Sequence, residues 1–243
     1  MATLGYIILA TFLVSLASLV GVITLSIKTQ TLQKYLLYLV SLSAGTLIGG
    51  AFIHLLPEAI DQLDPTTTGQ IIVTAFIGFF FIEKVLHWHH CHDRDCPNHS
   101  LGYLNLIADA IHNFIDGLVI AATFLVDIKL GVATTIAVAL HEIPQEFGDF
   151  GVLLYSGFSR TKAILSNLLV ALTAITGGVL GFYLAGRIDH LVAYLLPLAA
   201  GSFIYIAASD LMPEIKQETS LKHSIISFTI FVSGIGLMLL LKE

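Results

Sequence analysis

Charged residues are scarce in this chain of 243 residues. Asp, Glu, Lys and Arg make up 12% of it, about half of the ~25% typical of a soluble domain. With 56% hydrophobic residues and a mean hydropathy of +0.88, this excludes a soluble enzyme. Lys and Arg number only 11 and the formal net charge is −6, so the chain lacks the basic surface that nucleic-acid-binding proteins need.

Apolar residues come instead in long runs, such as Leu4–Ile27 and Ala163–Ala185. A run of about 18 or more apolar residues matches the hydrocarbon core of a bilayer and is typical of a transmembrane helix. We therefore predict an all-α polytopic membrane protein, a single domain with eight transmembrane helices at residues 4–27, 35–57, 70–87, 102–126, 130–155, 163–185, 190–212 and 224–241.

Lys and Arg are unevenly divided between alternate loops. If both termini lie outside, all of the 11 basic residues except Lys129, Arg187 and Lys242 lie on the inner side, as the positive-inside rule favours. The chain has only 2 cysteines, Cys91 and Cys96, and this orientation puts them in a cytosolic loop. Thiols stay reduced in the cytosol, so we expect no structural disulfide.

Polar residues inside the predicted spans are concentrated in the fourth and fifth. Such groups are costly in a bilayer and usually mark a site or a pathway. In each span they recur at offsets of three or four residues and so share one helix face: Asn105, Asp109, His112 and Asp116 in the fourth span and His141, Gln145 and Asp149 in the fifth.

Two of these residues, His112 and His141, each lie about 11 residues from the start of their predicted spans, or ~16 Å along the helix. Antiparallel neighbours would therefore bring them to one level near the midplane, where they could share an ion. Imidazoles with carboxylates suit Zn²⁺, Fe²⁺ or Mn²⁺, whereas a Mg²⁺ or Ca²⁺ site would be all oxygen. The alternative is that these groups only hydrogen-bond between helices.

Pro144 lies within the polar part of the fifth span. A proline has no backbone N–H, so the carbonyl of Leu140, next to His141, loses its helical partner. An unpaired backbone group at this depth is tolerated where it lines a cavity.

A short internal match links His54-Leu-Leu-Pro-Glu58 in the second span with Asp210-Leu-Met-Pro-Glu214 in the seventh. The two segments would lie at opposite ends of their helices, which indicates inverted repeats (spans 1–3 and 6–8) around spans 4 and 5, a transporter architecture. The alternative is that Pro and Glu simply end two helices at the interfaces.

Four segments carry a resemblance to a known family: GGAFIHLLPEA (49–59), FFFIEKVLHWHHCH (79–92), HNFIDGLVI (112–120) and HEIPQEFGDFGVLL (141–154). The chain resembles the ZIP (Zrt/Irt-like) divalent-metal transporters, and the last segment resembles their LIV-1 branch. The resemblance implies a homodimer that imports Zn²⁺ into the cytoplasm through eight spans in a 3+2+3 arrangement.

The resemblance also implies a metal site between the fourth and fifth spans. The main site of the family corresponds to His112, Asp116, His141 and Gln145, and an adjacent second position corresponds to Asn113 and Glu142. Gln145 stands where the LIV-1 branch usually has His, and the sixth span lacks the Glu that two-metal members have there. We expect one tightly bound ion or an unequal pair.

The working hypothesis is alternating access with Zn²⁺ as substrate, Fe²⁺, Mn²⁺ and Cd²⁺ as further candidates, and no organic cofactor. The ion would enter past His54 and Glu58. It would bind at mid-membrane between His112, Asp116, His141 and Glu142. It would leave along Asp109, Glu146 and Asp149, with Asp210 and Glu214 in an exit vestibule or at the membrane interface. The compact loops suggest a multi-pass protein of the plasma membrane, in a prokaryotic cell.

A second candidate metal site is the loop at residues 88–100 with the end of the preceding span. Five of the 10 His and both Cys fall here: His87, His89, His90, Cys91, His92, Cys96 and His99. Such a tract can bind Zn²⁺ on the cytosolic side, although it lacks the Cys-x2-Cys pair of a closed structural site. The alternative is a polar loop whose histidines are partly charged near the headgroups.

Two rival functions come from the same residues. His141-Glu142 resembles the start of the His-Glu-x-x-His helix of zinc hydrolases, but Gln145 stands where the second His belongs. A metal effluxer would have the same ligands as an importer. The two are distinguished by whether expression of the protein raises or lowers the zinc content of the cell.

Overall fold

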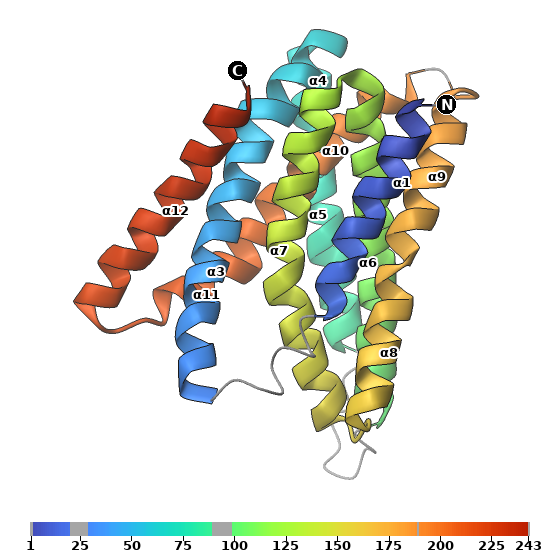
Figure 1. Ribbon diagram of the computed structural model, residues 1–243. Helices are drawn as coiled ribbons and strands as arrows, with labels where there is room; N and C mark the ends of the chain where they lie inside the picture. The colour runs from blue at the N-terminus through green and yellow to red at the C-terminus, as the bar shows by residue number, and fades with distance from the viewer. Residues whose placement is uncertain (1, 20–28, 89–98, 189, 243) are drawn as a thin grey trace.

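The computed structural model describes residues 2–19, 29–88, 99–188 and 190–242, and across these ranges it is helical without strands. The long helices lie side by side in a bundle, and the first and last described residues, Ala2 and Lys242, lie at the same end of it (Figure 1). The elements are α1 (Ala2–Ser15), η1 (Leu16–Leu19), α3 (Thr29–Gly49), η2 (Gly50–Leu55), α4 (Leu56–Gln62), α5 (Pro65–Trp88), α6 (His99–Val126), α7 (Ile128–Tyr155), α8 (Arg160–Ala171), α9 (Thr173–Ala185), α10 (Leu191–Ile206), η3 (Ala207–Leu211), α11 (Met212–Lys216) and α12 (Leu221–Lys242).

Seven helical segments in the described ranges are long and apolar enough to cross a membrane. The fold class is therefore confirmed: this is an all-α polytopic membrane protein. Helix α7 has 28 residues but is not among the seven, because its polar residues lower its hydropathy. It nevertheless packs against α3 and α6 within the bundle. The exact eight-span, 3+2+3 arrangement stays a prediction.

The two segments of the internal sequence match share one backbone irregularity. A π-helical turn, η2, precedes Leu56-Pro57-Glu58, and a second, η3, precedes Met212-Pro213-Glu214. Next to each proline, which cannot donate a backbone hydrogen bond, the N–H groups of Leu56 and Met212 donate to the carbonyls of Ala51 and Ala207, five residues back. The common π turn supports an internal repeat.

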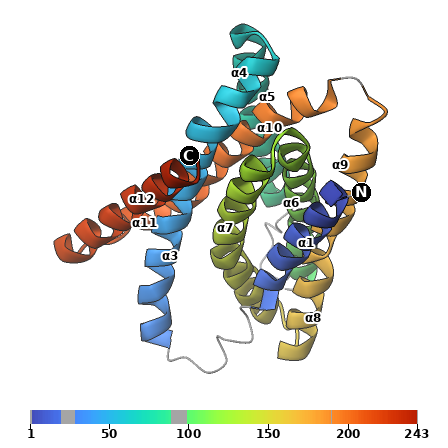
Figure 2. The ribbon, with the colours of Figure 1, turned by 45° about the horizontal axis from the view of Figure 1, so that its top comes forward.

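The helix contacts have the symmetry that an inverted repeat would produce. Helix α3 packs along α12, α10 packs along α5, and α1 packs along α9. Consider a repeat that relates α1 to α9, α3 to α10 and α5 to α12. It converts the α3–α12 contact into the α10–α5 contact and leaves the α1–α9 contact unchanged. Helices α3 and α10 run in opposite directions, and α12 stays beside α3 in both views (Figures 1 and 2).

Aspartates determine where two of the helices begin. Asp64 Oδ1 accepts a hydrogen bond from the Thr67 N–H at 3.0 Å at the start of α5. Hydrogen bonds from the Thr67 side chain and backbone lower the pKa of this exposed carboxyl. Asp127 accepts from the N–H groups of Lys129 and Leu130 at the start of α7. N-caps of this kind satisfy free N–H groups of the first turn and so define the start of α7.

Helices α3 and α12 touch backbone to backbone at Gly234. A carbon added there would lie 2.6 Å from the Leu42 carbonyl oxygen and 3.0 Å from the Thr46 nitrogen, both in α3. Small residues allow transmembrane helices to approach this closely.

We predict that Gly234→Ala lowers the midpoint of thermal unfolding in detergent, because the methyl group must push α12 away from α3. Overpacking of this kind costs about 1–3 kcal/mol. Gly236→Ala is the control, since nothing lies within 4 Å of a carbon added there, and alanine is a better helix former than glycine by about 1 kcal/mol. Unfolding is followed by size-exclusion chromatography after heating. Equal midpoints for the two variants would contradict the close contact.

Candidate metal centre

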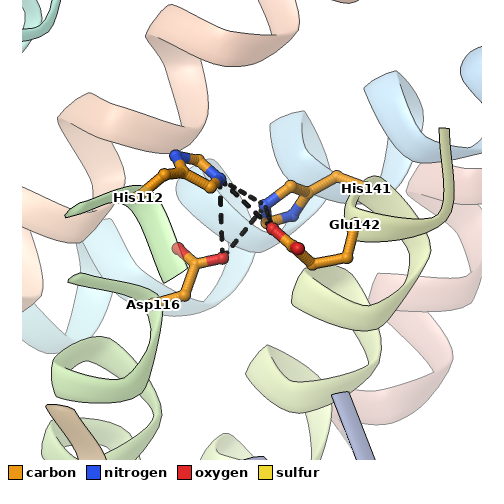
Figure 3. Close-up of side chains that lie close together, drawn as sticks. All are labelled: His112, Asp116, His141 and Glu142. Atoms are coloured by element: carbon orange, nitrogen blue, oxygen red, sulfur yellow. Dashed lines mark hydrogen bonds and ion pairs between the residues drawn. The ribbon is translucent and has the colours of Figure 1, made fainter. Parts of the chain in front are cut away.

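Four titratable side chains converge between α6 and α7. His112 and Asp116 come from α6, one helical turn apart, and His141 and Glu142 are neighbours in α7. The two helices pack on each other and are joined only by Asp127, so their central residues lie at the same level. All four side chains point toward one another (Figure 3).

The distances between their ends are those of a metal coordination shell. The Nε2 atoms of His112 and His141 lie 3.2 Å apart. Asp116 Oδ2 lies 3.1 Å from His141 Nε2 and 3.7 Å from His112 Nε2, and Glu142 Oε1 lies 3.3 Å from both. In a tetrahedral zinc site with bonds of about 2.0 Å, ligand atoms are about 3.3 Å apart. The four atoms therefore fit the size of such a shell.

These donor atoms are withdrawn from water. His141, Glu142 and Asp116 are buried, and neither Asp116 Oδ2 nor Glu142 Oε1 accepts a hydrogen bond. The Nδ1–H of His141 donates to the Ala137 carbonyl at 3.2 Å. This hydrogen bond leaves the Nε2 lone pair of a neutral His141 directed at the cluster, as in metal-binding histidines.

The carbonyl freed by Pro144 finds a partner on another helix. The hydroxyl oxygen of Ser43, in α3, lies 2.5 Å from the Leu140 carbonyl oxygen. It also lies 2.8 Å from the Leu39 carbonyl. The predicted gap in the α7 hydrogen bonding thus links α7 to α3 directly beside His141.

Gln145 and Asn113 lie next to the four-atom cluster, and their amide nitrogens point to one oxygen of Asp109. The Gln145 amide donates to Asp109 Oδ1 at 3.4 Å, and the Asn113 amide donates to the same oxygen at 2.8 Å. Glu142, which the resemblance puts at the adjacent position, lies in the cluster with the two histidines.

The predicted exit residues lie further along the same two helices. Asp109, Glu142 and Glu146 each offer a carboxylate oxygen within 4.8 Å of the others. Asp149 Oδ1 accepts a hydrogen bond from the Asn105 amide at 2.9 Å.

A cavity of about 820 Å³ connects Asp109 and Asp149 with the end of α10, with η3 and with α11. His112 and His141 line its inner end, and Asp149, Asp210 and Glu214 line it further out. Because Asp210 and Glu214 are exposed, the cavity reaches the surface there.

The remaining predicted residues are not brought to the cluster. His54 donates from Nε2 to the Met238 carbonyl of α12 at 2.8 Å, and Glu58 accepts from the Gln62 amide at 2.8 Å. In the histidine-rich tract, His89, His90, Cys91, His92 and Cys96 lie outside the described residues, and His87 and His99 belong to the end of α5 and the start of α6.

Three neighbours of the site were not predicted: Ser43, Asn167 and Phe203. Asn167, in α8, donates to the Glu146 carbonyl at 3.3 Å, and its position as a polar residue within an apolar run was an available signal. The Phe203 ring packs edge-on to His141 with centroids 5.9 Å apart. No sequence pattern distinguishes Phe203 or Ser43 from other residues of their helices.

Comparison with known proteins gives a consistent result. A family model described as ZIP Zinc transporter matches residues 2–101 and 89–242. Zinc transporter ZIP13 of Pongo abelii is 31% identical over 256 residues, covering 96% of this chain and 76% of the relative. ZIP13 of Mus musculus is 33% identical over 253 residues, covering 84% and 69%. Zinc transporter YKE4 of Saccharomyces cerevisiae is 32% identical over 219 residues, covering 77% and 63%.

We predict that Ser43→Ala weakens Zn²⁺ binding several-fold and lowers stability. The variant leaves the Leu140 carbonyl without this partner, at a cost of about 1–3 kcal/mol, and loosens α7 beside His141. Ser41→Ala is the matched control, because Ser41 is also buried in α3 but its hydroxyl donates to the Leu37 carbonyl of its own helix. Zn²⁺ affinity is measured by competition with a fluorescent chelator. Equal affinities of the two variants would show that the Ser43 contact does not support the site.

Proposed function

Because the chain belongs to the ZIP family of zinc transporters, we propose that it moves Zn²⁺ into the cytoplasm by alternating access. The family consists of transporters, not enzymes, and a divalent metal ion is the substrate. In the proposed mechanism the ion is held between α6 and α7 by His112, Asp116, His141 and Glu142.

One observation carries this assignment of the site: two imidazole nitrogens and two carboxylate oxygens, all from membrane helices, converge at 3.1–3.7 Å. Two nitrogens and two oxygens form a donor set suited to Zn²⁺ and also to Fe²⁺ or Mn²⁺. Two carboxylates would balance the charge of one divalent cation. A buried carboxylate without a cation or hydrogen-bond donor is unfavourable, so the arrangement favours cation binding.

The surroundings of the cluster differ on its two sides. Toward the bundle end that lacks Ala2 and Lys242, the cavity leads from His112 and His141 to the exposed Glu214. Toward the other end, Phe203, Ala137 and Leu47 are fully buried in the apolar core. Access from one side only is what alternating access requires of each of its states.

The basic residues support an inward direction for the open side. The end of α5, the start of α8, the end of α11 and the start of α12 lie away from the end that carries Ala2 and Lys242 (Figure 1). These ends carry Lys84, Arg160, Lys162, Lys216 and Lys222. Under the positive-inside rule this is the cytoplasmic side, so the described conformation would face inward.

We also propose that the protein is a homodimer of the plasma membrane. The dimer is what the resemblance implies. A prokaryotic source stays a prediction, and the relatives named above come from animals and yeast.

We predict that His141→Ala abolishes Zn²⁺ uptake into proteoliposomes, since it removes one of four ligands and a buried aromatic contact. His223→Ala is the control, because His223 is far along the chain at the start of α12 and pairs only weakly with Glu218, at 3.6 Å. Uptake is followed with a Zn²⁺-sensitive dye inside the vesicles, and binding by chelator competition. Wild-type uptake by His141→Ala would contradict the assignment of the site.

Direction of transport is tested in cells. We predict that expression raises cellular zinc, measured by mass spectrometry, and that His141→Ala does not. A fall in cellular zinc would favour efflux by the same ligands. The degree to which Fe²⁺, Mn²⁺ and Cd²⁺ each inhibit Zn²⁺ uptake in the proteoliposome assay then ranks these metals as substrates.

A further inference from the structure

The cavity that leads from the four-atom cluster to the surface is larger and more apolar than an ion requires. Its volume is about 820 Å³, whereas a divalent ion with six waters occupies about 200 Å³ at ~30 Å³ per water. Aliphatic and aromatic side chains from α3, α5, α6 and α10 form much of its wall: Leu37, Val40, Phe79, Ile82, Ile111 and Ile206. Sites for organic ligands have this size, about 300–1,000 Å³, and this kind of lining.

The cavity also lies open to the side, between α5 and α6. Within the described ranges α5 packs along α10, and α6 packs along α7 and α9 rather than along α5. Ile82 of α5 and Ile111 of α6 line the cavity and are also 39% and 43% exposed. Both belong to segments that are long and apolar enough to cross a membrane. The cavity therefore meets the lipid between these two helices, in addition to its polar opening at Asp210 and Glu214.

An apolar space beside a bilayer favours hydrocarbon as its content. Water is a poor occupant, because apolar walls offer it no hydrogen bonds. An empty space forfeits the dispersion contacts of the side chains around it. A lipid tail is as apolar as a leucine side chain, and the surrounding membrane supplies lipid tails in excess. An acyl chain is therefore the ligand that these walls favour.

The polar opening of the cavity carries negative charge. Asp149, Asp210 and Glu214 line this end, and Asp210 and Glu214 are exposed. Carboxylates repel an anionic headgroup and attract an ammonium group. The charge at the opening therefore favours a lipid with an ammonium-bearing headgroup over one with a net negative charge.

We propose that this cavity binds one acyl chain of a membrane phospholipid whose headgroup carries an ammonium group. The chain enters between α5 and α6, and the ammonium group lies at the opening beside Asp210 and Glu214. This ligand is separate from the transported ion, so the inference goes beyond the proposed function. Val40 and Ile206 report on it, because they line the cavity and are only 7% and 5% exposed. An acyl chain that stays on the outer surface does not reach them.

The test uses the full chain in nanodiscs of phosphatidylglycerol that contain a small fraction of phosphatidylethanolamine with a diazirine in the middle of one acyl chain. Illumination releases N₂ from the diazirine, and the resulting carbene inserts into a nearby C–H bond. Mass spectrometry of peptides locates the adducts. We expect adducts at Val40 and Ile206 in the wild type. Leu169 of α8, which is 69% exposed and lies outside the cavity, reports ordinary contact with the surrounding lipid.

A tryptophan at the side opening should exclude the chain. We expect Ile82→Trp to lower the adducts at Val40 and Ile206 several-fold. Ile77→Trp is the matched control, since Ile77 lies in the same helix, is 59% exposed and does not line the cavity. It should be labelled as the wild type is. Adducts at Leu169 and an unchanged elution volume show that both variants are folded.

Phosphatidylglycerol with the same diazirine chain tests the headgroup. We expect it to label Leu169 equally well and to label Val40 and Ile206 several-fold less. Adducts of the phosphatidylethanolamine at Leu169 without adducts at Val40 and Ile206 would overturn the proposal. Equal labelling of Val40 and Ile206 by the two lipids, or in the two tryptophan variants, would overturn it as well. Labelling is measured without Zn²⁺, so a failure of Zn²⁺ uptake leaves the lipid site in place, and a lack of adducts leaves the proposed transport in place.

Discussion

Electrostatic repulsion at the centre of the bundle is the constraint on which the other features depend. Asp116 and Glu142 are buried a few ångströms from the lone pair of His141, where the low dielectric strengthens every interaction between charges. Such a group of donors is favourable only with a cation or protons among them. Without either, the packing of α6 and α7 against the surrounding helices must offset the repulsion.

Helices α6 and α7 are each held by a close contact with a neighbouring helix. Gly117, next to Asp116, lies so close to α9 that an added carbon would meet the Ala174 backbone and come within 2.8 Å of the Gly178 nitrogen. On α7, Ser43 joins the Leu140 carbonyl to α3. One contact depends on the absence of a side chain and the other on the absence of a backbone N–H at Pro144. Each places helix backbone against a neighbour directly beside a side chain of the proposed metal site.

The sequence was sufficient for the all-α membrane fold and for the meeting of His112 and His141, because hydropathy determines the first and residue counting along a regular helix the second. It also indicated that the Leu140 carbonyl would lose its partner. It could not supply Ser43 as the replacement, since that contact joins residues 97 positions apart. Glu142 was among the predicted ligands through the family resemblance, whereas helix periodicity alone favoured Gln145, which shares the face of His141 on a regular helix. The glutamate has the reach to turn toward the imidazoles, and the glutamine amide instead finds a carboxylate acceptor at Asp109.

The π-helical turns η2 and η3 have a consequence for how faces are assigned along their helices. A π turn contains one residue more than the α-helical turn it replaces, and one residue corresponds to about 100° of rotation. Positions before Gly50 and after Leu55, or before Ala207 and after Leu211, therefore do not share a face at the usual intervals of three, four or seven. The assignment of residues to helix faces must therefore start again after the π turn. Hydrophobic residues whose spacing in the sequence seems irregular can then lie on one continuous face of the helix.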